Sequence, residues 1–230
     1  MTARYAARWE VGEVGGAVVA VDVIRAFTTA AYAFGAGAQE IYLVDSVDAA
    51  LRFKAERPGS LAMGEDRGRR PDGFDLSNSP VAAAAADVAG RTIVQRTSAG
   101  TRGMIAAGSA ERLWAGSLVV ASATAAAVSA SGLGPPTYVI TGRFEDQPDG
   151  GADDLLVAQL IERARVGEPL DAVATAAAVA ISEEARRTLL LGAGDVHPED
   201  IAYATSIDAF AFAMEAERRG SALILTPREI

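Results

Sequence analysis

The stretch GAVVAVDV, residues 16–23, decides the fold of this chain. It is short, rich in valine and bounded by glycine at its start, which predicts a buried β-strand. Short apolar runs of this kind alternate with helical patterns along most of the sequence, which is typical of a largely parallel sheet covered on both faces. We therefore expect one α/β domain over 1–230, with a largely parallel or mixed sheet and helices on both faces.

Working outward from residues 16–23, we predict the other elements from apolar runs and from Gly, Pro and Ser punctuation. Strands are expected at 40–44, 60–64, 91–96, 112–117, 136–142 and 221–227. Helices are expected at 28–34, 47–57, 80–89, 100–107, 121–131 and 153–165. Ser46 and Ser79 are the predicted N-caps of two of these helices. The last third is expected to be mostly helical, and AFAFAM, 209–214, is predicted as an apolar helix.

Two segments share one layout. Residues 28–46 and 101–117 both run from a helix through a small-residue turn and a glutamate to a strand that is followed by a serine. Duplication would make the fold two intertwined, related halves that present equivalent loops to one site. Two unrelated β-α-β units would look similar, and the sequence leaves both explanations open.

Composition excludes several classes of function. The chain of 230 residues has no cysteine and one histidine, His197. Disulfides, thiolate zinc sites, a cysteine nucleophile and a histidine cluster are therefore excluded. The net charge of -9 argues against non-specific nucleic-acid binding. The sequence has no apolar run of about 18 residues and no signal-peptide pattern, so we predict a cytoplasmic protein that does not bind membranes.

Charged and hydroxyl side chains follow the predicted strands, at the edge where an open parallel sheet binds ligands. They are Asp22 and Arg25, then Glu65 and Arg67, then Thr97, Ser98, Gly100 and Thr101, and finally Asp153 and Asp154. Carboxylates without cysteine or clustered histidine suit a hard cation such as Mg²⁺. Arginine, hydroxyl groups and a helix N-terminus suit phosphate. This edge is the expected site.

Each group also has a structural explanation. Ser98 as a plain helix cap is as well supported by the sequence as Ser98 in an anion site. Asp153 and Asp154 are also favourable charges for a first helical turn. Asp22 is different, because a carboxylate that emerges from a buried strand is costly without a partner. The chain has neither a P-loop nor a dinucleotide-binding glycine motif, so familiar phosphate motifs do not explain the pattern.

Five segments, in order, resemble one family. They are VAVDVIRAFTTAAYAFGAGAQEI (19–41), GEDRGRRPDGFDLSNSP (64–80), QRTSAGTRGM (95–104), GADDLLVAQLI (151–161) and GDVHPEDIAYATSIDAF (194–210). They are similar to conserved-motif blocks of the 2-phosphosulfolactate phosphatase (ComB-like) family. The most specific block is Gly73-Phe74-Asp75-Leu76 followed by Asn78-Ser79-Pro80.

The resemblance implies an α/β fold peculiar to that family and a Mg²⁺-dependent phosphatase. Its reaction converts 2-phospho-3-sulfolactate to 3-sulfolactate and phosphate, on the way to coenzyme M. The implied catalytic residues are Asp22, Arg25 and Glu65, and the implied metal ligands are Asp22, Glu65, Asp153 and Asp154. The implied substrate- and phosphate-binding residues are Arg67, Asn78, Thr97, Ser98, Gly100 and Thr101. The implied partner is a small anionic phosphorylated substrate. The sequence does not decide between a monomer and a homo-oligomer.

The sequence departs from the family pattern mainly on the phosphate side. The departures are Asp66 after the glutamate, Ser77, Gln95-Arg96, Ser98-Ala99, Asp153 and the weakly matching segment 182–191. They motivate a rival hypothesis, in which the chain is a non-catalytic or repurposed relative that binds an anionic phosphorylated metabolite.

Overall fold

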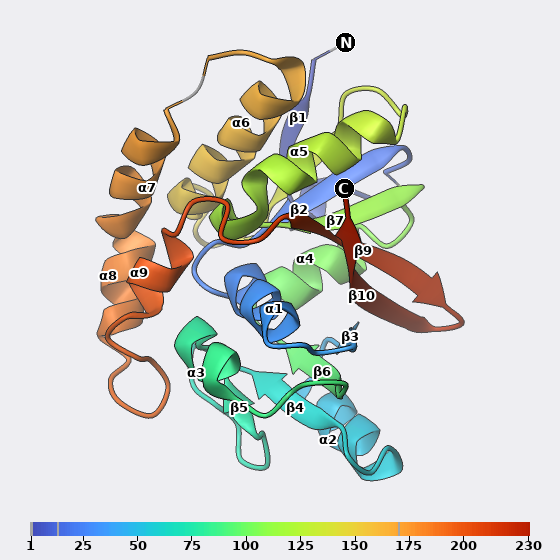
Figure 1. Ribbon diagram of the computed structural model, residues 1–230, viewed down its shortest axis with the longest axis vertical. Coiled ribbons are helices and arrows are strands. Elements are labelled where there is room, and N and C mark those ends of the chain that lie inside the picture. The colour runs from blue at the N-terminus through green and yellow to red at the C-terminus, as the bar shows by residue number, and fades with distance from the viewer. Residues whose placement is uncertain (1, 13, 170) are drawn as a thin grey trace.

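A computed structural model describes residues 2–12, 14–169 and 171–230, which form a mixed α/β structure around one ten-stranded sheet (Figure 1). The strand order is β1-β8-β2-β7-β9-β10-β3-β6-β4-β5. The strands are β1 (Arg4–Ala7), β2 (Ala17–Val21), β3 (Glu40–Leu43), β4 (Leu61–Gly64), β5 (Leu76–Ser77), β6 (Thr92–Arg96), β7 (Arg112–Gly116), β8 (Thr137–Ile140), β9 (Phe212–Arg219) and β10 (Ala222–Glu229). The predicted α/β fold class with a mixed sheet is confirmed.

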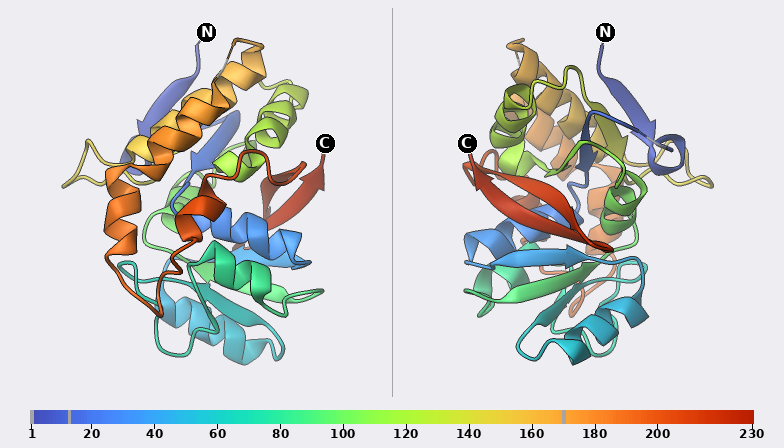
Figure 2. Two further views of the ribbon diagram at one scale, coloured as in Figure 1. Left: turned by 60° about the vertical axis from the view of Figure 1, so that its left-hand side comes forward. Right: turned by 90° about the vertical axis from the view of Figure 1, so that its right-hand side faces the viewer.

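The sheet consists of two parallel blocks joined by an antiparallel hairpin. One block is β1-β8-β2-β7 and the other is β3-β6-β4-β5. The hairpin β9-β10 lies between them, so three successive pairings (β7 with β9, β9 with β10, β10 with β3) are antiparallel. Because that number is odd, the two blocks run in opposite directions along the sheet. The sheet is twisted and curled, which both views of Figure 2 show.

Helices cover both faces of the sheet. They are α1 (Ala26–Gly35), α2 (Val47–Glu56), α3 (Pro80–Ala85), α4 (Gly100–Ala106), α5 (Ala121–Ala130), α6 (Ala152–Val166), α7 (Ala172–Ala180), α8 (Glu183–Leu189) and α9 (Asp200–Ala204), with short 3₁₀ turns at Arg8–Glu10 and Leu118–Val120. In β2, Val18 and Ala20 pack in a core with α1 and α4, whereas Val19 and Val21 pack in a core with α5 and α6. Residues 16–23 therefore do contain a strand buried on both faces, as predicted.

Two crossover units exchange strands between the blocks. The β2-α1-β3 unit leads from the first block to the second, and the β6-α4-β7 unit leads back. These are the units in which the sequence shows the shared layout. The carboxyl ends of β2 and β6 meet, since a Cβ on Gly100, which follows β6, would lie 2.8 Å from Oδ2 of Asp22, which follows β2. Only a residue without a side chain permits this approach.

The local predictions are mostly confirmed. Ser46 and Ser79 are N-caps, with hydroxyls that accept hydrogen bonds from the amides of Ala49 (3.3 Å) and Ala82 (3.2 Å). The prediction of a helix at 209–214 is wrong, because this segment leads into β9. Phe210 and Phe212 stack there, with ring centroids 5.3 Å apart, and Ala213 and Met214 are buried in the sheet.

Two further differences concern short elements. The edge strands β1 and β5 were not predicted, because they have only four and two residues and each pairs with one neighbour, β8 and β4 respectively. Helix α3 ends at Ala85 rather than at 89. Among the described residues, none of the helices is both long and apolar enough to cross a membrane.

Candidate active site

Asp22 lies where the two blocks meet, and it is almost completely buried. The strand β2 delivers it to this point, and its Oδ1 accepts a hydrogen bond from the amide of Ala26 in the first turn of α1 (2.8 Å). Its Oδ2 lies 3.1 Å from the hydroxyl of Thr141, just after β8. The sequence analysis assigned no role to Thr141, although it follows a predicted strand. The Asp22 carboxylate is therefore held at the carboxyl ends of two strands.

Two further aspartates enter from the first turn of α6, and both are buried. Asp154 accepts hydrogen bonds from the amides of Val23 (2.9 Å) and Gly142 (2.8 Å). It thus ties together the loops that follow β2 and β8. Asp153 differs from its neighbour, because its Oδ1 is buried with no hydrogen-bond partner among the described residues. The sequence could not separate the two aspartates, and the structure does.

Glu184 of α8 completes an acidic cluster, which we define as Asp22, Asp153, Asp154 and Glu184. Its Oε1 accepts a hydrogen bond from the amide of Gly151 (3.0 Å), and its Oε2 is buried without a partner among the described residues. The sequence analysis missed Glu184. It lies in segment 182–191, where the family pattern is weakest, so no motif marked it.

Burial, followed by the charge of neighbouring carboxylates, raises the pKa values of the three aspartates of the cluster. Burial raises the pKa of Asp22 to about 6. The pKa of Asp153 rises to about 8, first because of burial and then because of the negative charges of Glu184 and Asp22. The pKa of Asp154 lies well above its ordinary value, through burial and then through Asp153 and Asp22. Such a cluster is stabilised by a bound proton or by a cation.

The donor chemistry of the cluster fits Mg²⁺. Asp153 carries a buried oxygen that no group of the described residues satisfies, and buried oxygens of this kind call for a partner. No three acidic or histidine side chains of the described residues converge as a ready-made metal cage. Mg²⁺ does not need such a cage, because it takes one or two carboxylates and fills its shell with water and phosphate oxygens. Asp153 is the candidate with an unpartnered oxygen among the described residues. Asp22 is the second candidate, because its Oδ2 contacts a hydroxyl rather than an amide, whereas both oxygens of Asp154 already accept amide hydrogen bonds.

Two hollows adjoin at Asp22. The acidic hollow, of about 200 Å³, is lined by the acidic cluster and by Gly142, Phe144, Gln147, Gly150 and Arg187. The arginine hollow, of about 190 Å³, is lined by Arg25, Glu65, Gly68, Asn78, Thr97, Ser98 and Leu191. Both are also lined by Asp22, Ile24, Ala99 and Thr188. A substrate with two anionic groups could therefore reach both hollows from one position beside Asp22.

Arg25 lies in the arginine hollow and is nearly buried. Its Nη1 donates to Oδ2 of Asp200 (2.8 Å) and to the carbonyl oxygen of Asp195 (2.9 Å). Asp200 is fully buried at the start of α9. The sequence analysis gave Asp200 no role, although it lies in the family-like segment 194–210. The structure shows it as the partner that fixes Arg25.

Glu65, a predicted catalytic residue and metal ligand, uses its carboxylate to join two loops. Its oxygens accept hydrogen bonds from the amide of Ser98, from the hydroxyl of Ser98 (3.0 Å) and from the amide of Gly68 (2.6 Å). Gly64, just before it, has φ 135°, and a Cβ there would lie 1.9 Å from the carbonyl oxygen of Arg96. The ends of β4 and β6 are therefore pressed together, and Glu65 fastens the loops beyond them.

Thr97 and Thr101 bond mainly to each other. The Thr97 amide donates to the Thr101 hydroxyl (2.9 Å), and the Thr101 amide donates to the Thr97 hydroxyl (3.0 Å). This arrangement satisfies the start of α4 internally. Thr97 and Ser98 line the arginine hollow, whereas Thr101 is fully buried and does not line it. Their predicted roles in phosphate binding remain predictions.

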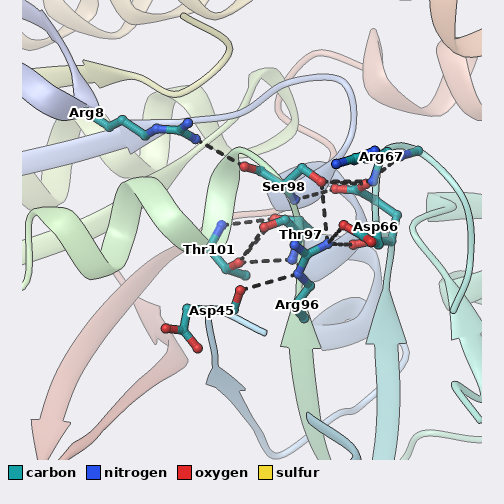
Figure 3. A network of polar contacts seen from close by, with 10 residues as sticks. Arg8, Asp45, Asp66, Arg67, Arg96, Thr97, Ser98 and Thr101 are labelled. Carbon is teal, nitrogen blue, oxygen red and sulfur yellow. Dashed lines mark hydrogen bonds and ion pairs between the residues drawn. The ribbon is translucent and has the colours of Figure 1, made fainter. Parts of the chain in front are cut away.

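Arg67 and Arg96 occupy contrasting positions in the same network (Figure 3). Arg67 is exposed, and its backbone amide donates to the Ser98 hydroxyl (3.0 Å). Arg96 is nearly buried, and its Nη1 donates to the carbonyl oxygen of Glu65 and to Oδ1 of Asp66, both at 2.7 Å. Arg67 is therefore at the rim of the site, and Arg96 supports the loops from inside.

Comparison with known proteins bears on the function of this arrangement. A protein-family model described as 2-phosphosulpholactate phosphatase matches residues 6–218. The chain belongs to this family. The match contains every candidate residue of the sequence analysis, from Asp22 to Asp154, and also Glu184 and Asp200. It confirms the resemblance that the five sequence segments indicated.

Curated relatives agree with the family match. A protein of Carboxydothermus hydrogenoformans is 44% identical over 109 residues, which are 47% of this chain and 45% of that protein. A protein of Bacillus subtilis is 40% identical over 96 residues, 42% of each chain. One of Thermus thermophilus is 48% identical over 90 residues, 39% of this chain and 37% of that protein. Each is named probable 2-phosphosulfolactate phosphatase, and the alignments span less than half the length of each relative.

Two departures from the 2-phosphosulfolactate phosphatase pattern prove to be in contact. Asp66 and Arg96, both named above as departures, form an ion pair at 2.7 Å. A third departure, Gln95, donates through Nε2 to the carbonyl oxygen of Ala26 (2.9 Å). These three changes therefore support the loops and α1, whereas the departure at Asp153 lies within the acidic cluster.

Proposed function

We propose that this protein is a Mg²⁺-dependent phosphatase that hydrolyses 2-phospho-3-sulfolactate at Asp22. The observation that carries the proposal is the acidic cluster, in which Asp22 reaches both hollows and Asp153 keeps a buried oxygen without a partner in the part of the chain that the structure describes. Family membership supplies the reaction class, a phosphoric monoester hydrolysis.

The chain's own groups divide the work. Asp22 is fixed by Ala26 and Thr141 and presents its carboxylate where a phosphoryl group enters. Asp154 holds the two flanking loops at a constant distance from each other. Asp153 and Asp22 would hold Mg²⁺, which when bound neutralises phosphoryl charge. Arg25, paired with Asp200, presents N–H donors on the opposite side of Asp22.

Two roles for Asp22 agree with its position. As a base, it takes a proton from an attacking water while the bond from phosphorus to the ester oxygen breaks. As a nucleophile, its oxygen bonds to phosphorus while the ester oxygen leaves, and water then cleaves the aspartyl phosphate. Rapid quenching and mass spectrometry after mixing with substrate separate the two, because only the nucleophile gains a phosphoryl group.

The decisive experiment measures phosphate release from 2-phospho-3-sulfolactate. We expect release with Mg²⁺, none after chelation and recovery when Mg²⁺ is restored. Asp22→Asn should lower kcat by about 1,000-fold, in the range that a lost acid–base group costs. Asp87→Asn, at an exposed aspartate remote from both hollows, is the matched control and should retain wild-type kcat.

An unchanged rate in Asp22→Asn would contradict the proposal. Saturable binding of 2-phospho-3-sulfolactate, without release from it or from a broad panel of phosphate esters, would instead support the rival function as a metabolite-binding relative. The internally bonded Thr97 and Thr101 are the structural feature that favours the rival.

A further inference from the structure

We propose that Arg25 and Asn78 form the subsite that binds the sulfonate of the substrate, and that Asp200 is its positioning residue. This inference rests on the proposed function and deepens it, because it divides the substrate's anionic groups between the two hollows. The phosphoryl group belongs beside the acidic cluster, and the sulfonate belongs in the arginine hollow.

The arginine hollow offers hydrogen-bond donors that no protein acceptor among the described residues uses. Both hydrogen bonds that Arg25 makes within the described residues come from Nη1, so Nε and Nη2 have no protein acceptor there. The side-chain Nδ2 of Asn78 donates no hydrogen bond to the described residues, so it is the donor that this side chain offers to a sulfonate oxygen. Its Oδ1 is also buried without a partner among them, but it is an acceptor and requires a donor from water or from another part of the substrate. Arg25 and Asn78 are both more than nine-tenths buried and line the same hollow. Buried polar groups of this kind are expected to bond to a ligand or to water.

A buried carboxylate supports these donors from beneath. Asp200, which is fully buried, accepts from Nη1 of Arg25 through Oδ2 and from the hydroxyl of Ser79 through Oδ1 (2.6 Å). Ser79 is the neighbour of Asn78 in the chain, so one carboxylate fixes both sides of the subsite. The amide of His197 also donates to Oδ2 (3.0 Å), which anchors the loop before α9.

The charge of this hollow also favours a sulfonate. The Arg25–Asp200 pair nearly cancels its own charge, so the subsite offers N–H donors rather than a strong positive field. Glu65 also lines this hollow, but its oxygens already accept hydrogen bonds from Ser98 and Gly68. A sulfonate is a monoanion of very low basicity with charge spread over three oxygens. It suits such a site better than a phosphoryl dianion, which suits a cation or several arginines.

The test compares three phosphate esters. They are 2-phospho-3-sulfolactate, 2-phospholactate, which lacks the sulfonate, and the phosphate ester of isethionate, which lacks the carboxylate. For Asn78→Ala we expect the kcat/KM ratio of 2-phospho-3-sulfolactate to 2-phospholactate to fall by about 10- to 100-fold, the loss expected for a hydrogen bond to a charged group. The isethionate ester should lose as much as 2-phospho-3-sulfolactate does.

Further variants keep the test decisive. Asn78→Asp adds a repelling charge and should lower the same ratio further than Asn78→Ala, and it serves if the alanine variant does not fold. Asp200→Asn replaces one acceptor oxygen by an NH₂ group, so it loses the hydrogen bonds on that side together with the charge opposite Arg25. The ratio should therefore fall through a higher KM for the sulfonate esters, with kcat changed less. Gln39→Ala, at an exposed amide, is the control and should leave the ratio unchanged.

The outcomes separate this inference from the proposed function. If the wild-type protein releases phosphate from none of the three esters, the proposed function fails. If the wild type is active and Asn78→Ala slows all three esters equally, the sulfonate assignment is overturned. A loss confined to the two esters that carry a carboxylate also overturns it and assigns the subsite to that group.

Discussion

The acidic cluster and the network around Glu65 make opposite use of similar residues. Both stand at the carboxyl ends of strands, and both contain nearly buried carboxylates. In the network, the oxygens of Glu65 accept three hydrogen bonds, and Arg96 pairs with Asp66. In the cluster, an oxygen of Asp153 has no partner among the described residues, and the pKa of three aspartates is raised.

The difference shows how to tell a structural charge from a functional one. Satisfied carboxylates stabilise the fold, because each loop amide gains an acceptor. Crowded carboxylates cost stability, and such a cost is typical of sites that await a ligand. The comparison therefore predicts effects of opposite sign on the free energy of unfolding. Substitutions in the network around Glu65 should lower it, and substitutions in the acidic cluster should raise it.

The largest effect is expected from Glu65→Ala. It leaves the amides of Ser98 and Gly68 without their acceptor, and the lost charge-assisted hydrogen bonds should lower the free energy of unfolding by about 3 kcal/mol. Urea denaturation monitored by circular dichroism measures this. Glu56→Ala, at the exposed end of α2, is the control and should change the value by less than about 0.5 kcal/mol. A loss of stability as small as that of the control would show that Glu65 does not hold the two loops together.

Asp153→Asn should have an intermediate effect of opposite sign. The folded state favours protonated Asp153, because its pKa is raised to about 8 there, compared with about 4 in the unfolded chain. The contribution of Asp153 to the free energy of unfolding is therefore fully present below about pH 4, and it is lost as the pH rises through about 8. Without metal at pH 8.5, the substitution should raise the free energy of unfolding by about 1 to 2 kcal/mol, with little gain at pH 4.

Urea titrations at both pH values check this expectation, with Mg²⁺ absent and present. Added Mg²⁺ should stabilise the wild type more than Asp153→Asn, because the variant has lost a candidate ligand. If Asp153→Asn is less stable than the wild type at pH 8.5, the Asp153 carboxylate forms stabilising interactions in the folded protein. Asp153 would then not differ from Glu65 in the way we predict.

The smallest effect is expected from Asp66→Asn. The side chain of Asp66 is half exposed, at 50%, so its pair with Arg96 is well screened. Its loss should cost about 0.5 kcal/mol, and added salt should shrink the difference. A double-mutant cycle with Arg96→Gln isolates the pairwise term. A coupling of several kcal/mol would mean that this pair, rather than Glu65, holds the loops together.

The sequence predicted most of the fold because local pattern governs it. Buried valines gave β2, and serine caps gave the starts of α2 and α3. The error at 209–214 has a physical cause, since Phe and Ala at alternating positions fit both a buried helix and a strand. Pairing with β10 and β7, which no local pattern shows, decides in favour of β9.

For the site, the sequence predicted the residues better than their roles. Asp22, Arg25, Glu65, Asn78 and Asp153 do gather around the two hollows. Glu184 and Asp200 were missed, because each acts through a contact with a residue at least 30 positions away in the chain, as Gly151–Glu184 and Arg25–Asp200 show. Hydrogen-bond partners this distant leave no periodicity or spacing in a single sequence.

The sequence by itself determined the α/β class, the family and the set of polar residues, because residue type and local order are enough to recognise them. Only the tertiary structure decided that the ends of β2 and β6 meet although their blocks run in opposite directions, since the curl of the sheet is a property of all ten strands. It also decided that Glu65 is satisfied while Asp153 is not. In the sequence, Glu65 and Asp153 are both carboxylates that follow a predicted strand. They differ in the hydrogen-bond donors that the tertiary structure places beside them.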